Sequence, residues 1–229
     1  MSLFLASSAA ALSMAMQSVS PVHYHVDIES QSEGPALVRV AVEFVGDTDG
    51  ETRIALPNSW GGETELWKGL TALSVRGQNA TIIETETPDQ LIIRHAPGAE
   101  VTFAYDVIQD WEGIPTAGQG NDYRPVLQPE YVHLIGDTWV VDVEVAFDAP
   151  LTVSVNAPAD WQLATDLTHA ETFTPETLHA SILVAGDFRV HERIIDGVSV
   201  RVAMRGQYTF SDVMFVDMLR SAMQANHGY

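Results

Sequence analysis

From residue 22 onward, hydrophobic and polar residues alternate with a period of two over most of the chain. The apolar positions of the clearest runs are Val22-Tyr24-Val26-Ile28, Val38-Val40-Val42-Phe44, Val101-Phe103-Tyr105-Val107, Trp139-Val141-Val143-Val145-Phe147, Leu151-Val153-Val155 and Val198-Val200-Val202-Met204. Successive side chains of a strand point to opposite faces, so each run predicts a strand with one buried and one wet face. Turn-forming clusters such as Asp148-Ala149-Pro150 separate the runs. The pattern predicts a mainly β fold of antiparallel sheets packed as a sandwich.

Two stretches depart from this period. Residues 64–73 carry Leu66, Leu70 and Leu73 at wider spacing, which predicts a short helix or an ordered loop. The second stretch is near residues 211–226, where apolar residues recur at steps of three and four behind a possible serine N-cap. The residues of this stripe are Met214, Met218, Ala222 and Ala225. A helix is therefore expected near the end of the chain, with this stripe partly exposed.

Charge and cysteine content exclude several classes of function. The 229 residues include 11 basic and 31 acidic ones, for a formal net charge of −20, and Lys68 is the single lysine. A nucleic acid or an anionic membrane surface would be repelled, so neither is expected as a partner. The absence of cysteine removes disulfides, thiolate metal ligands and cysteine nucleophiles.

The first 16 residues resemble a signal peptide in part. An apolar run ends at Ser13-Met14-Ala15, which has the small-x-small form of a cleavage site, but no Lys or Arg precedes the run. The run is too short to span a bilayer. We therefore consider residues 1–16 either a signal peptide or a disordered arm, and expect an exported protein, periplasmic or extracellular, with a cytoplasmic location as the alternative.

The domain organisation follows from these patterns. Residues 22–206 are expected to form a β-rich domain, with a sub-domain boundary possible at the polar, Gly-rich segment 113–122. A helix directly after so many strands is an ordinary first element of another domain. We therefore expect residues 207–229 to begin a following domain that is missing from this chain.

Metal and catalytic motifs are weak. His191-Glu192 would need a second histidine at position 195 to form a zinc-peptidase helix motif, and that position is Ile195. His23 and His25 share one strand face but lack an evident third ligand, so a solvated face is favoured. The sequence contains neither a Gly-x-Ser-x-Gly elbow nor a Gly-rich phosphate loop. We therefore expect no metal or cofactor site within this chain.

Rigid and aromatic residues are concentrated in two loops, residues 56–62 and 121–136. The second loop has Pro125 and Pro129 around a run that offers an amide, a carboxylate, a guanidinium and two phenols. Such a loop holds one shape, either packed against its own sheet or presented to a ligand.

At these loops the sequence resembles a known family. The motifs are Tyr24-x-Val26, Leu56-Pro57-x-x-Trp60-Gly61-Gly62, Tyr123-Arg124-Pro125-x-x-Gln128-Pro129-x-Tyr131-x-His133-x-Ile135-Gly136, Gly186-Asp187-Phe188 and Asp196-Gly197-Val198. Their order and spacing over residues 22–226 are similar to those of the N-terminal domain of the glycyl aminopeptidase family. These are gluzincin-type zinc metallopeptidases, often with a PDZ domain.

The resemblance implies that catalysis and the support of the substrate cleft belong to different domains. In that family the His-Glu-x-x-His motif and the third, Glu zinc ligand lie in a helical catalytic domain, so no zinc ligand or general base can be assigned here. We expect no peptidase activity from this chain alone, zinc only in the missing catalytic domain, and that domain and the peptide N-terminus as partners. A non-catalytic β domain of this kind would support and shape the substrate cleft.

The resemblance also supplies candidates for the rim of that cleft. In related aminopeptidases the β domain lends a Gln or Glu to hold the substrate α-amino group, and charge-assisted hydrogen bonds suit an ammonium. Gln128 and Glu130 are the candidates, with Tyr123 and Arg124 beside them.

The alternative is a self-standing, exported β-sandwich that binds protein or glycan through Trp60, Trp67, Trp111 and Tyr123. A reading frame continuing past Tyr229 into His-Glu-x-x-His would favour the peptidase.

Overall fold

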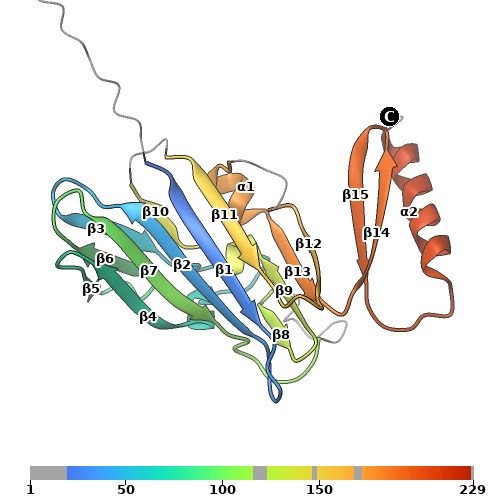
Figure 1. Cartoon of the computed structure of the whole chain (residues 1–229), viewed down its shortest axis with the longest axis horizontal. Helices are drawn as coiled ribbons and strands as arrows, with labels where there is room; N and C mark the ends of the chain where they lie inside the picture. The colour runs from blue at the N-terminus through green and yellow to red at the C-terminus, as the bar shows by residue number, and fades with distance from the viewer. Residues whose placement is uncertain (1–19, 116–122, 146–148, 168–171, 228–229) are drawn as a thin grey trace, which may run out of the picture.

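The computed structural model describes residues 20–115, 123–145, 149–167 and 172–227 (Figure 1). The predicted signal peptide or arm at residues 1–16 lies outside these ranges, as does most of the predicted boundary segment 113–122. Within them the protein is mainly β and ends in a helix, which confirms the predicted fold class.

The front layer in Figure 1 is a five-stranded sheet with the order β11-β1-β2-β7-β4. Its strands are β1 (Val22–Glu29), β2 (Leu37–Val45), β4 (Leu70–Gly77), β7 (Glu100–Val107) and β11 (Leu151–Asn156). All neighbours are antiparallel except β1 and β11, which pair in parallel with Val22 opposite Leu151. Alternation predicts a strand but not its direction, so this parallel pair was not predictable from the pattern.

The second layer consists of two four-stranded sheets (Figure 1). One has the order β10-β3-β6-β5, from β3 (Glu51–Ala55), β5 (Thr81–Glu84), β6 (Gln90–Arg94) and β10 (Asp142–Glu144). The other has the order β12-β13-β9-β8, from β8 (Val126–Gln128), β9 (Tyr131–Ile135), β12 (Gln162–Thr165) and β13 (Ile182–Gly186). Short helical turns lie in the connections from β3 to β4, from β9 to β10 and from β12 to β13: η1 (Leu66–Gly69), η2 (Gly136–Thr138) and α1 (Pro175–His179).

One hydrophobic core joins the two layers. The alternating residues of β1, β2 and β7 point into it, and Phe103 is fully buried. The core also fixes two phenols, because Tyr24 Oη donates to the carbonyl of Val141 and Tyr105 Oη to that of Trp139, both at 2.8 Å. Buried residues from both sides of segment 113–122 belong to this one cluster. We call residues 22–186, which contain it, the body.

The end of the chain forms a separate unit beside the body, from β14 (Arg189–Ile195), β15 (Val198–Met204) and α2 (Asp212–His227) (Figure 1). We call it the C-terminal unit. The predicted helix is thus confirmed, and the predicted boundary at 206 falls between β15 and α2. Val216 is the helix residue that is buried, whereas Met214 and Met218 are 65% and 61% exposed, as expected for this stripe. None of the described helices is long and apolar enough to cross a bilayer.

Two sequence predictions need correction. The alternation from Trp139 to Phe147 predicted one strand, but β10 covers only 142–144 and the residues 146–148 are not described. Trp139, Val140 and Val141 are all buried, because they follow the η2 turn into the core instead of alternating between faces. In the predicted helix or loop at 64–73, η1 spans four residues and β4 already begins at Leu70.

Candidate functional site

The two rigid loops meet around the guanidinium of Arg124. Its Nε donates to Glu63 Oε2 at 2.8 Å, its Nη1 to Asp110, and its Nη2 to the carbonyl of Thr64 at 2.6 Å. The three charged side chains are only 14–19% exposed. Each of the three Arg124 nitrogens donates within the protein. Asp110 Oδ1 is buried without a hydrogen-bond partner among the described residues, so Arg124 is the group that balances this carboxylate. Arg124 therefore holds the two loops together.

An aromatic contact supports the same cluster. Trp60 and Tyr123 lie edge to face with ring centroids 4.9 Å apart, a favourable geometry for aromatic pairs. Gly61, with φ of 60°, leaves room for this contact, since a Cβ there would lie 2.7 Å from the Tyr123 ring. Tyr123 is still 42% exposed, so one side of its ring remains open to solvent.

Gln128 is held by a second amide, that of Gln109. Gln109 Oε1 accepts from the amide nitrogen of Gln128 at 2.8 Å and from the backbone N–H of Leu127 at 3.0 Å. Gln109 Nε2 donates to the carbonyls of Trp111 and Gly113, and Trp111 Nε1 donates to the carbonyl of Pro125. The start of β8 is thus fixed by side chains from the segment after β7.

Glu130 lies in a different setting, in the turn between β8 and β9. Its carboxylate is 56% exposed and lies 3.5 Å from Nη2 of Arg205, which also binds Asp187. The Arg205 guanidinium lies 4.5 Å from the centre of the Tyr131 ring. Glu130 is therefore at the contact between the body and the C-terminal unit.

The structure thus divides the four candidates. Tyr123 and Arg124 are joined to loop 56–62, Gln128 belongs to the Gln109 network, and Glu130 belongs to the Arg205 contact. Of the proposed aromatic platform, Trp60, Tyr123 and Trp111 lie near these networks. Trp67 instead lines a separate cavity of about 460 Å³ at the edge between β4 and the β5–β6 turn.

A group that sequence reasoning missed surrounds His179 at the end of α1. Nε2 lies 2.8 Å from Asp142 and Nδ1 3.4 Å from Asp137. The hydrogen bond to Asp142 raises the pKa of His179, while burial raises that of Asp137. His179 and Asp142 line a cavity of about 500 Å³ with Val143 and other residues.

The short helix α1 could have been found from the sequence. Thr174 caps it, Pro175 occupies its first position, and the Thr174 and Thr177 side chains satisfy each other's backbone N–H groups. Thr-Pro-Glu-Thr is a recognisable start signal. The two aspartates are far away in the chain, so the cluster itself had no local signal.

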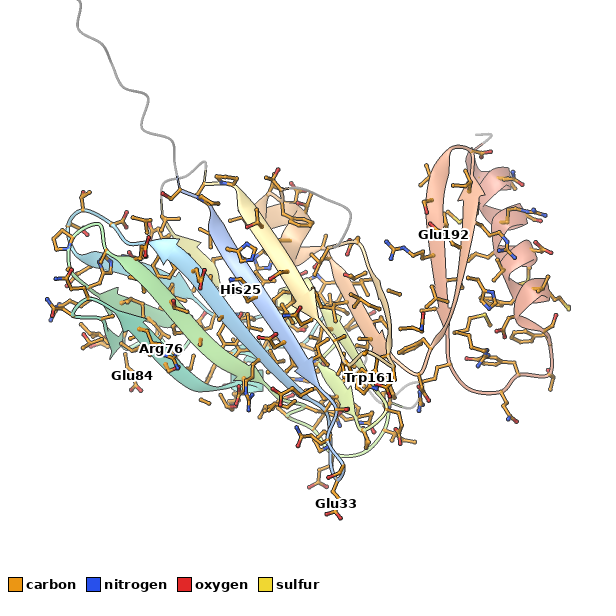
Figure 2. All side chains as sticks on the ribbon, in the orientation of Figure 1. His25, Glu33, Arg76, Glu84, Trp161 and Glu192 are labelled. Atoms are coloured by element: carbon orange, nitrogen blue, oxygen red, sulfur yellow. The ribbon has the colours of Figure 1, made fainter. Side chains whose placement is uncertain are left out.

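The remaining histidine candidates are engaged by protein groups. His25, on the outer face of β1 (Figure 2), bonds Ser154 and lies 3.3 Å from Glu43. His23 bonds Thr152 and Ser154, and burial lowers its pKa. In the part of the chain that the structure describes, no group of three or more His, Cys, Asp or Glu side chains is placed to hold a metal ion. The described residues therefore do not fit a zinc centre.

His191 has a structural partner. It lies 2.9 Å from Asp212, which also accepts two hydrogen bonds from Arg189, and these partners lower the pKa of Asp212 well below its usual range. Asp212 is the first residue of α2, so this contact fixes the start of α2 on β14.

Comparisons with known proteins agree with this architecture. The sequence pattern of the Peptidase M61 N-terminal domain matches residues 23–185. An aminopeptidase N family protein from Idiomarina loihiensis has a similar fold, with a TM-score of 0.69 at 16% identity over 89% of this chain. An M1 zinc metallopeptidase from Deinococcus radiodurans gives a TM-score of 0.42 at 16% identity, over 88% of this chain and 51% of its own.

The matched proteins are longer than this chain, which spans 35% of the Idiomarina protein. The likeness in fold to the Idiomarina protein covers 89% of this chain, so it extends beyond residue 185, where the family match ends. No curated protein matches the sequence.

Proposed function

The chain belongs to the Peptidase M61 N-terminal domain family, and from this premise we propose that it is the non-catalytic β domain of a zinc aminopeptidase-like protein. In this proposal the domain supports and shapes the substrate cleft of a separate, helical catalytic domain. The observation that carries the proposal is the family match over residues 23–185. The likeness in fold to the Idiomarina protein, of which this chain spans 35%, agrees with a domain within a larger enzyme.

The surface of the C-terminal unit supports a domain partner. Val213, Met214 and Met218 on α2 and Tyr208 before it are all at least half exposed. Large apolar side chains gathered on one element are typical of an interaction surface. We propose that the catalytic domain covers them.

Zinc and its chemistry belong to that catalytic domain in this proposal. The described residues of this chain offer no fitting ligand group. We expect the purified chain to hold no stoichiometric zinc after chelation and dialysis, and to release no product from glycyl or alanyl chromogenic substrates with zinc added. One tightly bound zinc per chain, lost on His23→Ala or His191→Ala, would contradict this.

The rim of the cleft is the second part of the proposal. We propose that Glu130, whose carboxylate is half exposed, or Gln128 binds the α-amino group of a peptide substrate. A carboxylate and an amide oxygen both accept from an ammonium, and the charged bond is the stronger. Tyr123 and Arg124 complete the rim, with Arg124 holding Tyr123 in place through loop 56–62.

The test uses the protein together with its catalytic domain. Glu130→Gln and Gln128→Ala should raise KM for free-amine peptides, since a charged hydrogen bond contributes about 1.5–3 kcal/mol, roughly ten- to a hundredfold. N-acetylated substrates should be nearly unaffected. Glu33→Gln, an exposed acid in the β1–β2 connection (Figure 2), is the matched control.

A contrary outcome is well defined. If Glu130→Gln and Gln128→Ala lowered the melting temperature but left the kinetics within about twofold of the parent, the loop would be a structural cap. The rim proposal would then fail while the domain assignment stood.

We also propose that the protein is exported. The support is the apolar run and the Ser13-Met14-Ala15 site, which lie outside the described residues. Sequencing the N-terminus of the protein recovered from its native cells tests this, because cleavage after Ala15 is expected and an intact Met1 would oppose it.

A further inference from the structure

The body and the C-terminal unit pack as separate cores. The main hydrophobic cluster contains buried residues from Val22 to Ala185 and none beyond. Ile195, Met204 and Val216 are buried apart from that cluster. Apolar packing therefore does not fix the orientation of one unit on the other.

A polar junction forms where the two units meet. We call Glu130, Tyr131, Asp187 and Arg205 the Arg205 junction. Arg205 follows β15, and Asp187 lies in the connection from β13 to β14. In the body, Glu130 lies in the β8–β9 turn and Tyr131 is the first residue of β9. One guanidinium thus contacts two segments that are distant from each other and from Arg205 in sequence.

The contacts of Arg205 use most of its donor fork. Nε and Nη2 both bind the Asp187 carboxylate, Nη2 also lies 3.5 Å from Glu130 Oε2, and the ring of Tyr131 lies beneath the guanidinium at 4.5 Å. The hydrogen bond to Asp187 raises the pKa of Arg205, so its charge is permanent. A planar fork over an aromatic face is geometry that lysine does not reproduce.

The backbone at the junction is tight. The N–H of Asp187 donates to the carbonyl of Glu130 at 3.1 Å. A Cβ on Gly186 would lie 2.5 Å from that same carbonyl oxygen. Tyr131 and Phe188 lie edge to face with centroids 5.7 Å apart. The connection to β14 is therefore held against the β8–β9 turn at one place.

Away from the junction the units leave open space. A cavity of about 560 Å³ lies between the outer side of β12–β13 and β15, with Ile182 and Val184 on one wall and Arg201 and Ala203 on the other. β12 also lies beside β14 and β15. A unit whose buried residues do not join the main cluster can still change its angle by small backbone changes at the joint.

We infer that Arg205 is the positioning residue that sets the angle of the C-terminal unit on the body. Removing its side chain releases the end of β15 from Asp187 and Glu130, so the C-terminal unit can change its angle on the body. The inference concerns this chain alone. It deepens the proposed function, in which this angle would set the placement of the catalytic domain, but its test needs no catalytic activity.

The absence of cysteine makes the test direct. Ser74→Cys on β4 and Gln224→Cys on α2 place one nitroxide label on each unit at exposed positions, and pulsed electron resonance gives their distance distribution. The parent should give one narrow distribution. Arg205→Ala should broaden it by about twofold or more, since a weakly packed interface permits relative motion of two units. Arg205→Lys should give an intermediate width.

Arg193→Ala is the matched control, because it removes the same charge from the C-terminal unit, where Arg193 donates to the carbonyl of its neighbour Glu192. It should leave the distribution unchanged. If Arg205→Ala kept the parent distribution, the inference would be overturned. If Arg205→Ala also lost helix content by circular dichroism, the Asp187→Asn variant would be the deciding test, because it retains Arg205. Asp187→Asn must broaden the distance distribution for the inference to stand. Zinc content and kinetics play no part, so failure here is distinct from failure of the proposed function.

Discussion

The body and the C-terminal unit contain similar hydrophobic patterns but bury them to different extents. In the body, the alternating residues of β1, β2 and β7 are buried between two layers of sheet. In the C-terminal unit, a two-stranded sheet packs on one helix, and Ile194, Val198 and Met218 are each more than half exposed. The body buries its apolar faces between two layers of sheet, whereas the C-terminal unit has one two-stranded sheet and one helix.

The difference shows how stability is distributed. A two-stranded sheet is marginal by itself, and it needs a helix or further strands to become stable. Here α2 supplies that cover on one face, and the Asp212 contacts with Arg189 and His191 fix its start. We therefore expect the body to carry the global stability and the C-terminal unit to open first.

The largest expected effect is in the body. Phe103→Ala should lower the free energy of unfolding by about 3–5 kcal/mol, because a fully buried ring leaves a cavity between the layers. Urea unfolding followed by circular dichroism measures this. Met218→Ala, at an exposed position of α2, should change it by less than about 0.5 kcal/mol. Equal effects of the two variants would mean that the two units share one core.

A smaller and local effect is expected in the C-terminal unit. Val216→Ala removes two buried methyl-sized groups, worth about 1.5 kcal/mol, so amides of α2 should exchange roughly tenfold faster. Hydrogen exchange resolved by segment is the measurement. Amides of β2 and β7 should keep their rates, and acceleration there would show that the units unfold together.

The smallest expected effect separates ion pairing from packing within the body. The pKa of His179 is raised above 6.5 in the folded protein, so its contribution to stability is complete below about pH 6.5 and is lost as pH rises through the raised value. Asp137 and Asp142 are the acids that face it. His179→Gln should cost about 1 kcal/mol at pH 5.5, given the half-exposed Asp142, and little at pH 9.

Unfolding free energies measured at both pH values check this difference. Asp166→Asn, which alters an acid outside the His179 cluster, serves as the control for a general charge effect. A loss in His179→Gln that is the same at pH 5.5 and pH 9 would indicate lost packing rather than a lost ion pair.

Much of the fold was predictable because its signals are local. The four apolar residues of β1 are all buried, as the alternation indicated, and α2 begins within one residue of the predicted start. The run from Trp139 misled because a buried coil also accepts consecutive apolar residues. Pattern alone does not distinguish a strand with one wet face from a segment that turns into the core.

The candidate site was predictable only in part. The rigidity of the two loops was expected from their prolines and aromatics. Their closure by Arg124 depends on Glu63 and Asp110, which lie 61 and 14 positions before it in the sequence. Glu130 was selected as a rim residue from a resemblance. Its contact with Arg205, 75 positions later, had no counterpart in the pattern.

The sequence by itself determined which residues of β1, β2 and β7 face the core, where the last helix lies, and the family to which the chain belongs, because periodicity and motif order are properties of neighbouring residues. Only the tertiary structure decided the parallel pairing of β1 with β11, the gathering of Asp137, Asp142 and His179, and the polar junction at Arg205. Each of these joins segments separated along the chain, and the physical reason is that layer packing selects which distant segments meet once the local elements have formed.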